Sequence, residues 1–297
     1  MSCVLCCVDG KNYSQSACDY AVMISNNMKL PLKILNVIEH SSKSDILDLS
    51  GNIKLGEKDD ILEKLTNEES IKSKQIIKEG KDLLLALKEK ALITAEQDVI
   101  LMQAHGDILD NILELQDEIS ILIIGIKSHD KNKIGENVKD IIRELNKPIL
   151  LVNSEFITPK KILIAYNGSE ESKKILTTAV RNPIFKDVTR DIVNINDDKL
   201  FSEKILDEAK KIYAKSEINI KKKQNKAKKK KTKREKEKKT TGLSGDAKTE
   251  ILTYMYENDC DILAMGAFGH SRIKEFIFGS FTSEIIAQSK KPILFYR

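Results

Sequence analysis

The sequence has no run of apolar residues long enough to cross a membrane. The longest run, Ile121 to Ile126, falls far short of the ~20 residues that a membrane-spanning helix requires. The segment that begins at Met1 also lacks the charged and then apolar pattern of a secretory signal. We therefore expect a cytoplasmic protein with no membrane span.

Cysteine is scarce, at 5 residues, and its pattern does not complete a metal site. Cys3 and Cys6 have the CxxC spacing of redox and metal sites, but no second pair of Cys or His completes a ligand set. Residues three apart in an extended strand also point to opposite faces, so these two thiols would not converge. We interpret the cysteines as small buried hydrophobic residues, with a redox or metal site as the alternative.

Short catalytic motifs are missing as well. Neither half of the chain has the P-loop pattern of Gly-x4-Gly-Lys followed by Ser or Thr. No carboxylate pair and no Ser-His-Asp set stands out by motif, although residues that are distant in sequence can meet in space. We therefore predict no catalytic residues, and an enzyme remains an alternative.

Positive charge is concentrated in one tract, Lys221 to Lys239. Thirteen Lys or Arg and two Glu give this tract a charge of +11, so the rest of the chain carries −6 of the net +5. We expect a solvated, disordered insertion. Such a tract could bind RNA, DNA or anionic lipid by salt-sensitive attraction, but it has no interleaved aromatic residues for base stacking. We favour a tolerated expansion of a surface loop, with weak nucleic-acid binding as the alternative.

What the sequence does contain is a repeat, in a chain of 297 residues that suffices for two domains. Each half opens with an apolar run that ends in Asp or Asn and then Gly. Each continues with Gly-Asp before a helical pattern, a second apolar run that ends in Gly, and a closing Lys-Pro-Ile-Leu. The matched segments are 3–10 with 161–168, 105–113 with 244–252, 119–125 with 260–266, and 147–150 with 291–294.

Apolar strands that alternate with amphipathic helices predict a parallel sheet covered on both faces. The predicted fold class is α/β, with two tandem doubly wound, Rossmann-like domains that each contain a mostly parallel five-stranded sheet. We place the domains at residues 1–153 and 160–297. The linker between them contains Pro159.

Several local features follow from the same patterns. Asp107 and Asp246 are expected to cap helix N-termini. Further strands are expected at 32–38, 191–195 and about 240–243. A helix in the second half is expected to end near Ser216, and residues 40–67 are interpreted as a loop-rich insertion.

The segment after Gly266 is the first place to look for a ligand site, because open α/β sheets bind ligands beyond the carboxyl ends of their strands. It reads Gly266-x2-Gly269-x9-Gly279-Ser280, and a helical pattern follows. Glycines let a backbone approach a ligand closely, and Gly-Ser at the start of a helix offers free amides and a dipole for phosphate. Glycine that merely turns the chain is the alternative, but three glycines and a serine in this strand context favour a phosphate-binding loop.

At these residues the chain resembles the universal stress protein family, as a tandem pair in which only the second half has a complete ATP-type loop. The resemblance covers nearly the whole chain. It implies a five-stranded α/β fold in each half and ATP in the second half, with Mg²⁺ or Mn²⁺ implied by the phosphate chemistry. It also implies that the last strands, 148–152 and 292–296, pair within the chain as in a pseudo-dimer, and a homodimer of such chains is the further option.

The resemblance assigns the second-half site by position. Gly266 would border the ribose, Gly269 and Gly279 would admit the phosphates, and Ser280 would bind a phosphate oxygen. The ends of the first and second strands would contribute Asn167, in place of the family's usual Asp, and Ile195. The predicted ATP-binding residues are Asn167, Ile195, Gly266, Gly269, His270, Ser271, Arg272, Gly279, Ser280, Phe281 and Thr282.

The first half departs from this pattern. Asp9 and Gly10 are intact, but Ser128 stands at the second glycine and Glu136 stands where a phosphate-binding serine is wanted. A carboxylate next to a phosphate is repulsive. We therefore predict that the first half does not bind ATP.

These observations support a non-catalytic or barely catalytic ATP-binding module for stress signalling. A slow ATPase or nucleotidyl transferase on the same fold is the second hypothesis. A polyanion-binding protein that acts through the lysine tract is the third.

Overall fold

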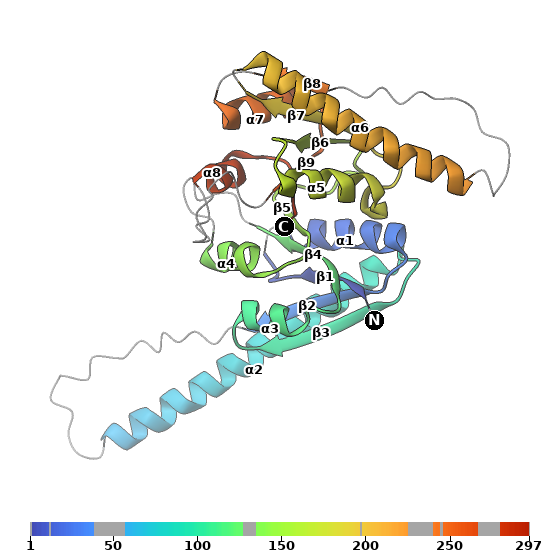
Figure 1. Ribbon diagram of the computed structural model, residues 1–297. Coiled ribbons are helices and arrows are strands. Elements are labelled where there is room, and N and C mark those ends of the chain that lie inside the picture. Colours follow the sequence, from blue (N-terminus) through green and yellow to red (C-terminus); the bar gives the residue numbers. More distant parts are fainter. Residues whose placement is uncertain are drawn as a thin grey trace.

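The computed structural model describes residues 2–11, 13–38, 57–126, 135–196, 198–224, 240–243, 246–266 and 280–296. Within them, the strands form one ten-stranded sheet in the order β3-β2-β1-β4-β5-β10-β9-β6-β7-β8 (Figure 1). The first half of the chain supplies β1 to β5 and the second half supplies β6 to β10, so one sheet runs through both halves.

The first half follows the repeat predicted from the sequence. Its elements are β1 (Cys3–Cys7), α1 (Ser14–Met28), β2 (Leu32–Ile38), α2 (Glu57–Ala91), β3 (Val99–His105), α3 (Ile108–Glu114), β4 (Ile119–Gly125), α4 (Glu136–Glu144) and β5 (Ile149–Val152).

The second half repeats this order and adds a short 3₁₀ helix, η1. Its elements are β6 (Lys161–Ala165), α5 (Glu170–Arg181), η1 (Pro183–Phe185), β7 (Thr189–Ile195), α6 (Lys199–Gln224), β8 (Thr240–Leu243), α7 (Ala247–Glu257), β9 (Ile262–Gly266), α8 (Ser280–Gln288) and β10 (Ile293–Tyr296).

Within each half the neighbouring strands are parallel, which confirms the predicted fold class. The chain first builds β1, β2 and β3 outward in one direction and then places β4 and β5 on the other side of β1. Strand order therefore reverses between β1 and β4, and equivalently between β6 and β9. Ligands bind at such reversal points in open α/β sheets.

The two halves join where β5 pairs antiparallel with β10. Leu150 pairs with Leu294, flanked by Leu151 with Ile293 and by Ile149 with Phe295. The pairing expected between the last strands is therefore present within the chain. Because β5 lies between β4 and β10, and β10 lies between β5 and β9, both last strands are interior to the sheet.

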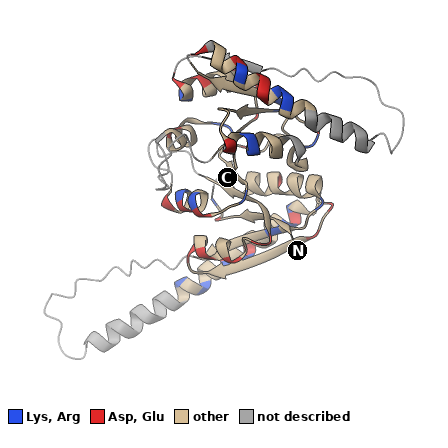
Figure 2. Cartoon of the chain, viewed as in Figure 1, with Lys and Arg blue, Asp and Glu red and all other residues tan. Residues whose placement is uncertain are grey.

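Two helical layers cover the sheet. Alternate residues of β1 show why, since Val4 and Cys6 pack into one hydrophobic cluster while Leu5 and Cys7 pack into the other. The first cluster includes residues of α1, α2, α5 and α6, and the second includes residues of α3, α4, α7 and α8. The charged residues of the described part lie mainly on the helices and loops, while the central strands are almost free of them (Figure 2).

Both predicted helix caps are confirmed. The Asp107 side chain accepts hydrogen bonds from the backbone N–H groups of Leu109 and Asp110 at the start of α3. The Asp246 side chain accepts from the N–H of Thr249 at the start of α7. A carboxylate at this position satisfies helix N–H groups that have no partner within the helix.

Two expectations about helix bounds were wrong. The region 40–67 was interpreted as loop-rich, but α2 begins at Glu57 and its first turns project away from the sheet (Figure 1). The helix expected to end near Ser216 continues to Gln224, so it includes the start of the lysine tract. Lysine and glutamine favour a helix in their own right, which local charge counting overlooks. Residues 225–239 of the tract lie outside the described residues.

All five cysteines are buried and unpaired, as the sequence indicated. Burial raises the pKa of the Cys7, Cys18 and Cys260 thiols to about 12 in each case, so these side chains are neutral and apolar in character. Within the described residues there is no cluster of His, Cys, Asp and Glu that could hold a metal ion.

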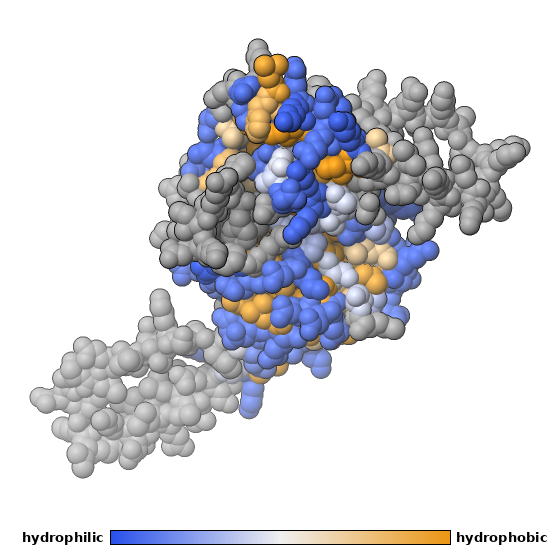
Figure 3. All heavy atoms as spheres, viewed as in Figure 1, coloured by the Kyte–Doolittle hydropathy of each residue, from blue (hydrophilic) through white to orange (hydrophobic). Residues whose placement is uncertain are grey.

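No described helix is both long enough and apolar enough to cross a bilayer. The face shown in Figure 3 is mainly hydrophilic over its described part, with apolar side chains scattered among polar ones. Single apolar side chains of this kind are normal on protein surfaces.

Candidate functional site

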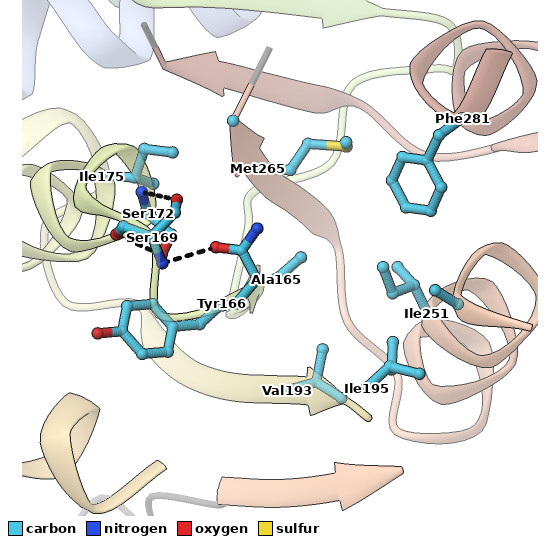
Figure 4. Close-up of a pocket in the computed structure, with 13 residues that line it drawn as sticks. Ala165, Tyr166, Ser169, Ser172, Ile175, Val193, Ile195, Ile251, Met265 and Phe281 are labelled. Atoms are coloured by element: carbon cyan, nitrogen blue, oxygen red, sulfur yellow. Dashed lines mark hydrogen bonds between the residues drawn. The ribbon is translucent and has the colours of Figure 1, made fainter. Parts of the chain in front are cut away.

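A cavity of about 370 Å³ lies at the carboxyl ends of β6, β7 and β9, where the strand order of the second half reverses (Figure 4). Its walls are mostly apolar. The lining residues are Ala165, Tyr166, Asn167, Ser169, Ser172, Ile175, Val193, Ile195, Ala247, Ile251, Met265, Gly266 and Phe281.

The turn after β6 forms one wall of the cavity. Gly168 has φ +79°, and an added Cβ there would lie 3.2 Å from the Ile205 side chain, so glycine suits both the backbone and the packing. The Ser169 N–H donates to Asn167 Oδ1 at 3.0 Å, and Ser169 Oγ in turn accepts from the Ser172 N–H at 3.1 Å and caps α5. These bonds hold the Asn167 carboxamide in a defined orientation at the mouth of the cavity.

The ends of β6 and β7 are tied together beneath the cavity. Asn194, 2% exposed, donates from Nδ2 to the backbone carbonyl of Tyr166 at 2.8 Å. The residues on either side of it, Val193 and Ile195, then line the cavity. Burial raises the pKa of the Tyr166 hydroxyl to about 12, so this side chain remains neutral even at moderately alkaline pH.

Helices α7 and α8 complete the cavity. Ile251 of α7 faces Phe281 of α8 across the apolar space, with Met265 at the end of β9 nearby (Figure 4). Ala247 of α7 also lines the cavity. Because α8 begins at Ser280, the N–H groups of its first turn, which have no partner within the helix, lie at this edge of the cavity. None of the described lining residues carries a charged side chain.

The structure brings together four of the residues predicted from the sequence. Asn167, Ile195, Gly266 and Phe281 all line the cavity, although they come from three strand ends and a helix. Thr282 lies in the first turn of α8 and is buried. Ser280 opens α8, and the predicted contacts Gly269, His270, Ser271, Arg272 and Gly279 lie outside the described residues.

Sequence reasoning missed the apolar walls and the asparagine beneath them. Met265 and Val193 were expected only as strand residues, and Ala247 and Ile251 only as part of a helix. The sequence does contain a signal for Asn194, because Asn36 occupies the matching position in the first half. In the structure Asn36 Nδ2 donates to the Val8 carbonyl at 3.0 Å. A buried asparagine at the same position of two repeated strands indicates a shared structural role.

The first half has a larger cavity, of about 810 Å³, at the equivalent strand ends. Its lining includes Asp9, Gly10, Glu79 and Glu136. Asp9 Oδ1 accepts from the Lys11 N–H at 2.9 Å and from Ser14 Oγ at 3.1 Å. A groove therefore exists in this half, but the described residues place carboxylates in it, including one in the first turn of α4 where a phosphate would approach. The absence of ATP from this half stays a prediction.

The comparisons with known proteins agree with the repeat. The sequence matches the universal stress protein family over residues 1–153 and again over residues 158–297. The chain belongs to the universal stress protein family. It is 27% identical over 302 residues to a universal stress protein of Synechocystis, with 99% of each chain covered.

Solved structures of universal stress proteins share this architecture. One from Archaeoglobus fulgidus superposes with a TM-score of 0.60 at 15% identity, covering 99% of this chain and 96% of its own. Another universal stress protein from Archaeoglobus fulgidus, solved in complex with dAMP, covers 48% of this chain at 16% identity with a TM-score of 0.33. The first of these likenesses concerns the fold, and the second describes the ligand of that protein alone.

Proposed function

We propose that this universal stress protein binds ATP in the cavity of its second half and acts as a nucleotide-dependent signalling module. The observation that carries the proposal is the convergence of Asn167, Ile195, Gly266 and Phe281 on one cavity at the strand-order reversal. All four are among the ligand contacts predicted from the sequence and the family resemblance. A cavity unrelated to the predicted loop would have gathered a different set.

The cavity suits a flat apolar group with a polar edge. Ligand pockets usually measure roughly 300–1,000 Å³ and are mainly apolar, with a few polar groups that fix orientation. At about 370 Å³ the cavity is at the small end of this range, which suits a base and its sugar. Asn167 and Ser169 are the polar groups at its mouth. The phosphates would extend from the sugar towards the start of α8.

Phosphate binding would depend on backbone rather than on side-chain charge within the described lining. The first turn of α8 presents N–H groups that have no partner within the helix, together with the positive end of the helix dipole. Mg²⁺ or Mn²⁺ bound to phosphate oxygens would supply the remaining positive charge.

The composition of the lining favours binding over catalysis. General base catalysis needs a titratable side chain within hydrogen-bond reach of the reacting group. The described lining residues include no histidine and no carboxylate. We therefore place ATP as a ligand whose presence biases the conformation or partner choice of the protein, with slow hydrolysis as the alternative.

A pair of matched substitutions tests the location of the site. Ala247 begins α7 and lines the second cavity, and Ile108 begins α3 and lines the first. Ala247→Phe fills the second cavity from its α7 wall. Ile108→Phe places a phenylalanine at the matching position of the first half. We expect titration calorimetry with Mg·ATP to find about one site per chain in the wild type and in Ile108→Phe, and none in Ala247→Phe. Loss of binding in Ile108→Phe alone would move the site to the first half.

A double variant tests the loop itself. Gly279→Val with Ser280→Ala should abolish ATP binding, because a branched side chain obstructs the backbone and the serine hydroxyl is removed. The folded state of each variant should be checked by its thermal unfolding midpoint. A variant that melts like the wild type and still binds ATP with wild-type affinity would overturn the assignment of the loop.

A further inference from the structure

We infer that Asn153, a residue of the first half, positions helix α8 for phosphate binding in the second half. The inference rests on the proposed function, because it concerns the helix whose N-terminus would meet the phosphates. It assigns a role to a side chain that lies at the opposite end of that helix.

The contact is short and fully enclosed. Asn153 Nδ2 donates to the backbone carbonyl of Ser289 at 2.7 Å. The two residues are 3% and 1% exposed. Ser289 directly follows the last residue of α8, and its N–H donates to the Ile285 carbonyl at 2.9 Å. The asparagine thus donates to the carboxyl end of α8, where carbonyl groups have no partner within the helix.

The antiparallel register of β5 and β10 creates this contact. Leu151 pairs with Ile293, and since the strands run in opposite directions, the end of β5 lies beside the start of β10. Asn153 directly follows the last residue of β5. Ser289 directly follows α8 and begins the tight turn that leads into β10. In that turn Ser289 Oγ donates to the Lys291 carbonyl at 2.8 Å and accepts from the Lys291 N–H at 3.2 Å. The end of α8 is therefore held by a turn from its own half and by a side chain from the other half.

Apolar packing holds much of the rest of α8 against the sheet. Ile285 and Ile286 pack into the hydrophobic cluster on one face of the sheet, and Glu284 forms an ion pair with Lys248 of α7. Apolar packing is not directional, so it permits a short helix to slide along its axis. A buried hydrogen bond at one end fixes the axial position, and a nine-residue helix transmits that position to Ser280 at the other end.

The dipole of α8 adds a second effect. A donor at the carboxyl end of a helix interacts favourably with its negative pole. Loss of that donor leaves the Ser289 carbonyl buried without this partner, which the helix can relieve only by moving. A movement of α8 would shift its N–H groups relative to the phosphates, whereas the apolar pocket for the base takes Phe281 from α8 and the rest of its described lining from β6, β7, β9, α5, α7 and the turn after β6.

The test compares ligands that differ only in their phosphates. Dissociation constants for ATP and for adenosine are measured for the wild type, Asn153→Ala and a control, Asn27→Ala. Asn27 also donates from Nδ2 across the junction of the halves, to the Ile184 carbonyl at 3.1 Å. It belongs to α1, whose residues pack into the other hydrophobic cluster from those of α8. If Asn153→Ala is too unstable to assay, Asn153→Ser replaces it, and hydrogen exchange of the α8 amides reports whether the helix is loosened.

We expect Asn153→Ala to weaken ATP binding by about tenfold, the loss of one good hydrogen bond, while adenosine affinity changes by less than about twofold. Asn27→Ala should leave both affinities near the wild-type values. Equal losses for ATP and adenosine, or equal losses in the two variants, would show a general loosening and overturn the inference. If the wild type binds ATP and Asn153→Ala binds it with the same affinity, the inference is overturned but the proposed function is not. A wild type that binds no ATP overturns the proposed function and the inference with it.

Discussion

Asn36 and Asn194 make the same hydrogen bond in the two halves of the chain. Each is a buried residue near the end of a second strand, and each donates from Nδ2 to the carbonyl of the residue that follows the first strand, at 3.0 Å to Val8 and 2.8 Å to Tyr166. The bond holds two neighbouring strand ends in register beside each cavity. The internal repeat therefore extends to polar groups that no sequence motif marks.

Replacement of Asn194 should destabilise the second half and its cavity together. Asn194→Ala removes the donor and leaves the Tyr166 carbonyl without this partner, at a cost of about 1–3 kcal/mol in the free energy of unfolding. Urea denaturation measures that cost, and ATP titration should show weaker binding because Val193 and Ile195 lose their alignment. Asn36→Ala is the matched control, and it should destabilise the protein while leaving ATP affinity unchanged.

Gly80 is expected to be intolerant of substitution. A Cβ at this position would lie 2.5 Å from Gln103 Nε2 and 2.3 Å from Asn36 Oδ1, so these side chains or α2 would have to shift. Gly80→Ala should lower the free energy of unfolding by about 1–3 kcal/mol, as overpacking does, even though alanine favours a helix.

Gly135 provides the comparison for Gly80. Among the described atoms, an added Cβ there meets nothing within 4 Å. Gly135→Ala should therefore change the urea midpoint far less than Gly80→Ala does. A stabilised Gly80→Ala protein would show that α2 does not pack on β2 and β3 as described.

Stability should fall at alkaline pH because of the buried thiols. Burial raises the pKa of Cys7, Cys18 and Cys260 from 9.0 to about 12, so the unfolded chain loses these protons at a lower pH than the folded chain does. The unfolded state is then favoured as pH rises above 9.0, by about 1.4 kcal/mol per pH unit for each thiol. Thermal unfolding midpoints between pH 8 and pH 11 should decline, and the decline should be smaller in Cys7→Ala than in the wild type. An equal decline in both proteins would assign the effect to other groups.

Removal of the lysine tract should leave the nucleotide site intact. We expect deletion of residues 225–239 to leave ATP affinity unchanged, because the cavity lining comes from other segments. If the tract binds nucleic acid, retention on single-stranded DNA at low salt should disappear with the deletion. Retention that survives the deletion would place any such activity on the folded part of the chain.

The fold was predictable because its signals are local and repeated. Apolar runs such as Ile119 to Gly125, glycine turns and the caps at Asp107 and Asp246 each specify an element from a few neighbouring residues. Their recurrence predicted the second half, and the resemblance to the family implied the pairing of the last strands. Charge and polarity led to wrong helix bounds at the first turns of α2 and the last turns of α6. The residues there favour a helix by their intrinsic propensity.

The site was predictable only in part, for a physical reason. Glycine at a strand end leaves a trace in the sequence, which indicated Gly266, whereas Asn167 was implied by the resemblance to the family. The apolar walls leave none, because Met265 or Ile251 looks like any other core residue until the helix and strand that carry it are placed. The long-range contact between Asn153 and Ser289 depends on the register of two strands that are 140 residues or so apart in the chain, which no local pattern encodes.

Because β5 and β10 pair antiparallel, the chain can also be divided into two fragments that each supply one strand of this pair. A cut between residues 154 and 158 would leave two pieces, each with one bare strand whose partner is the bare strand of the other piece. Expressed separately, the pieces should recombine by strand complementation, and fusions placed at the cut would report that reassembly.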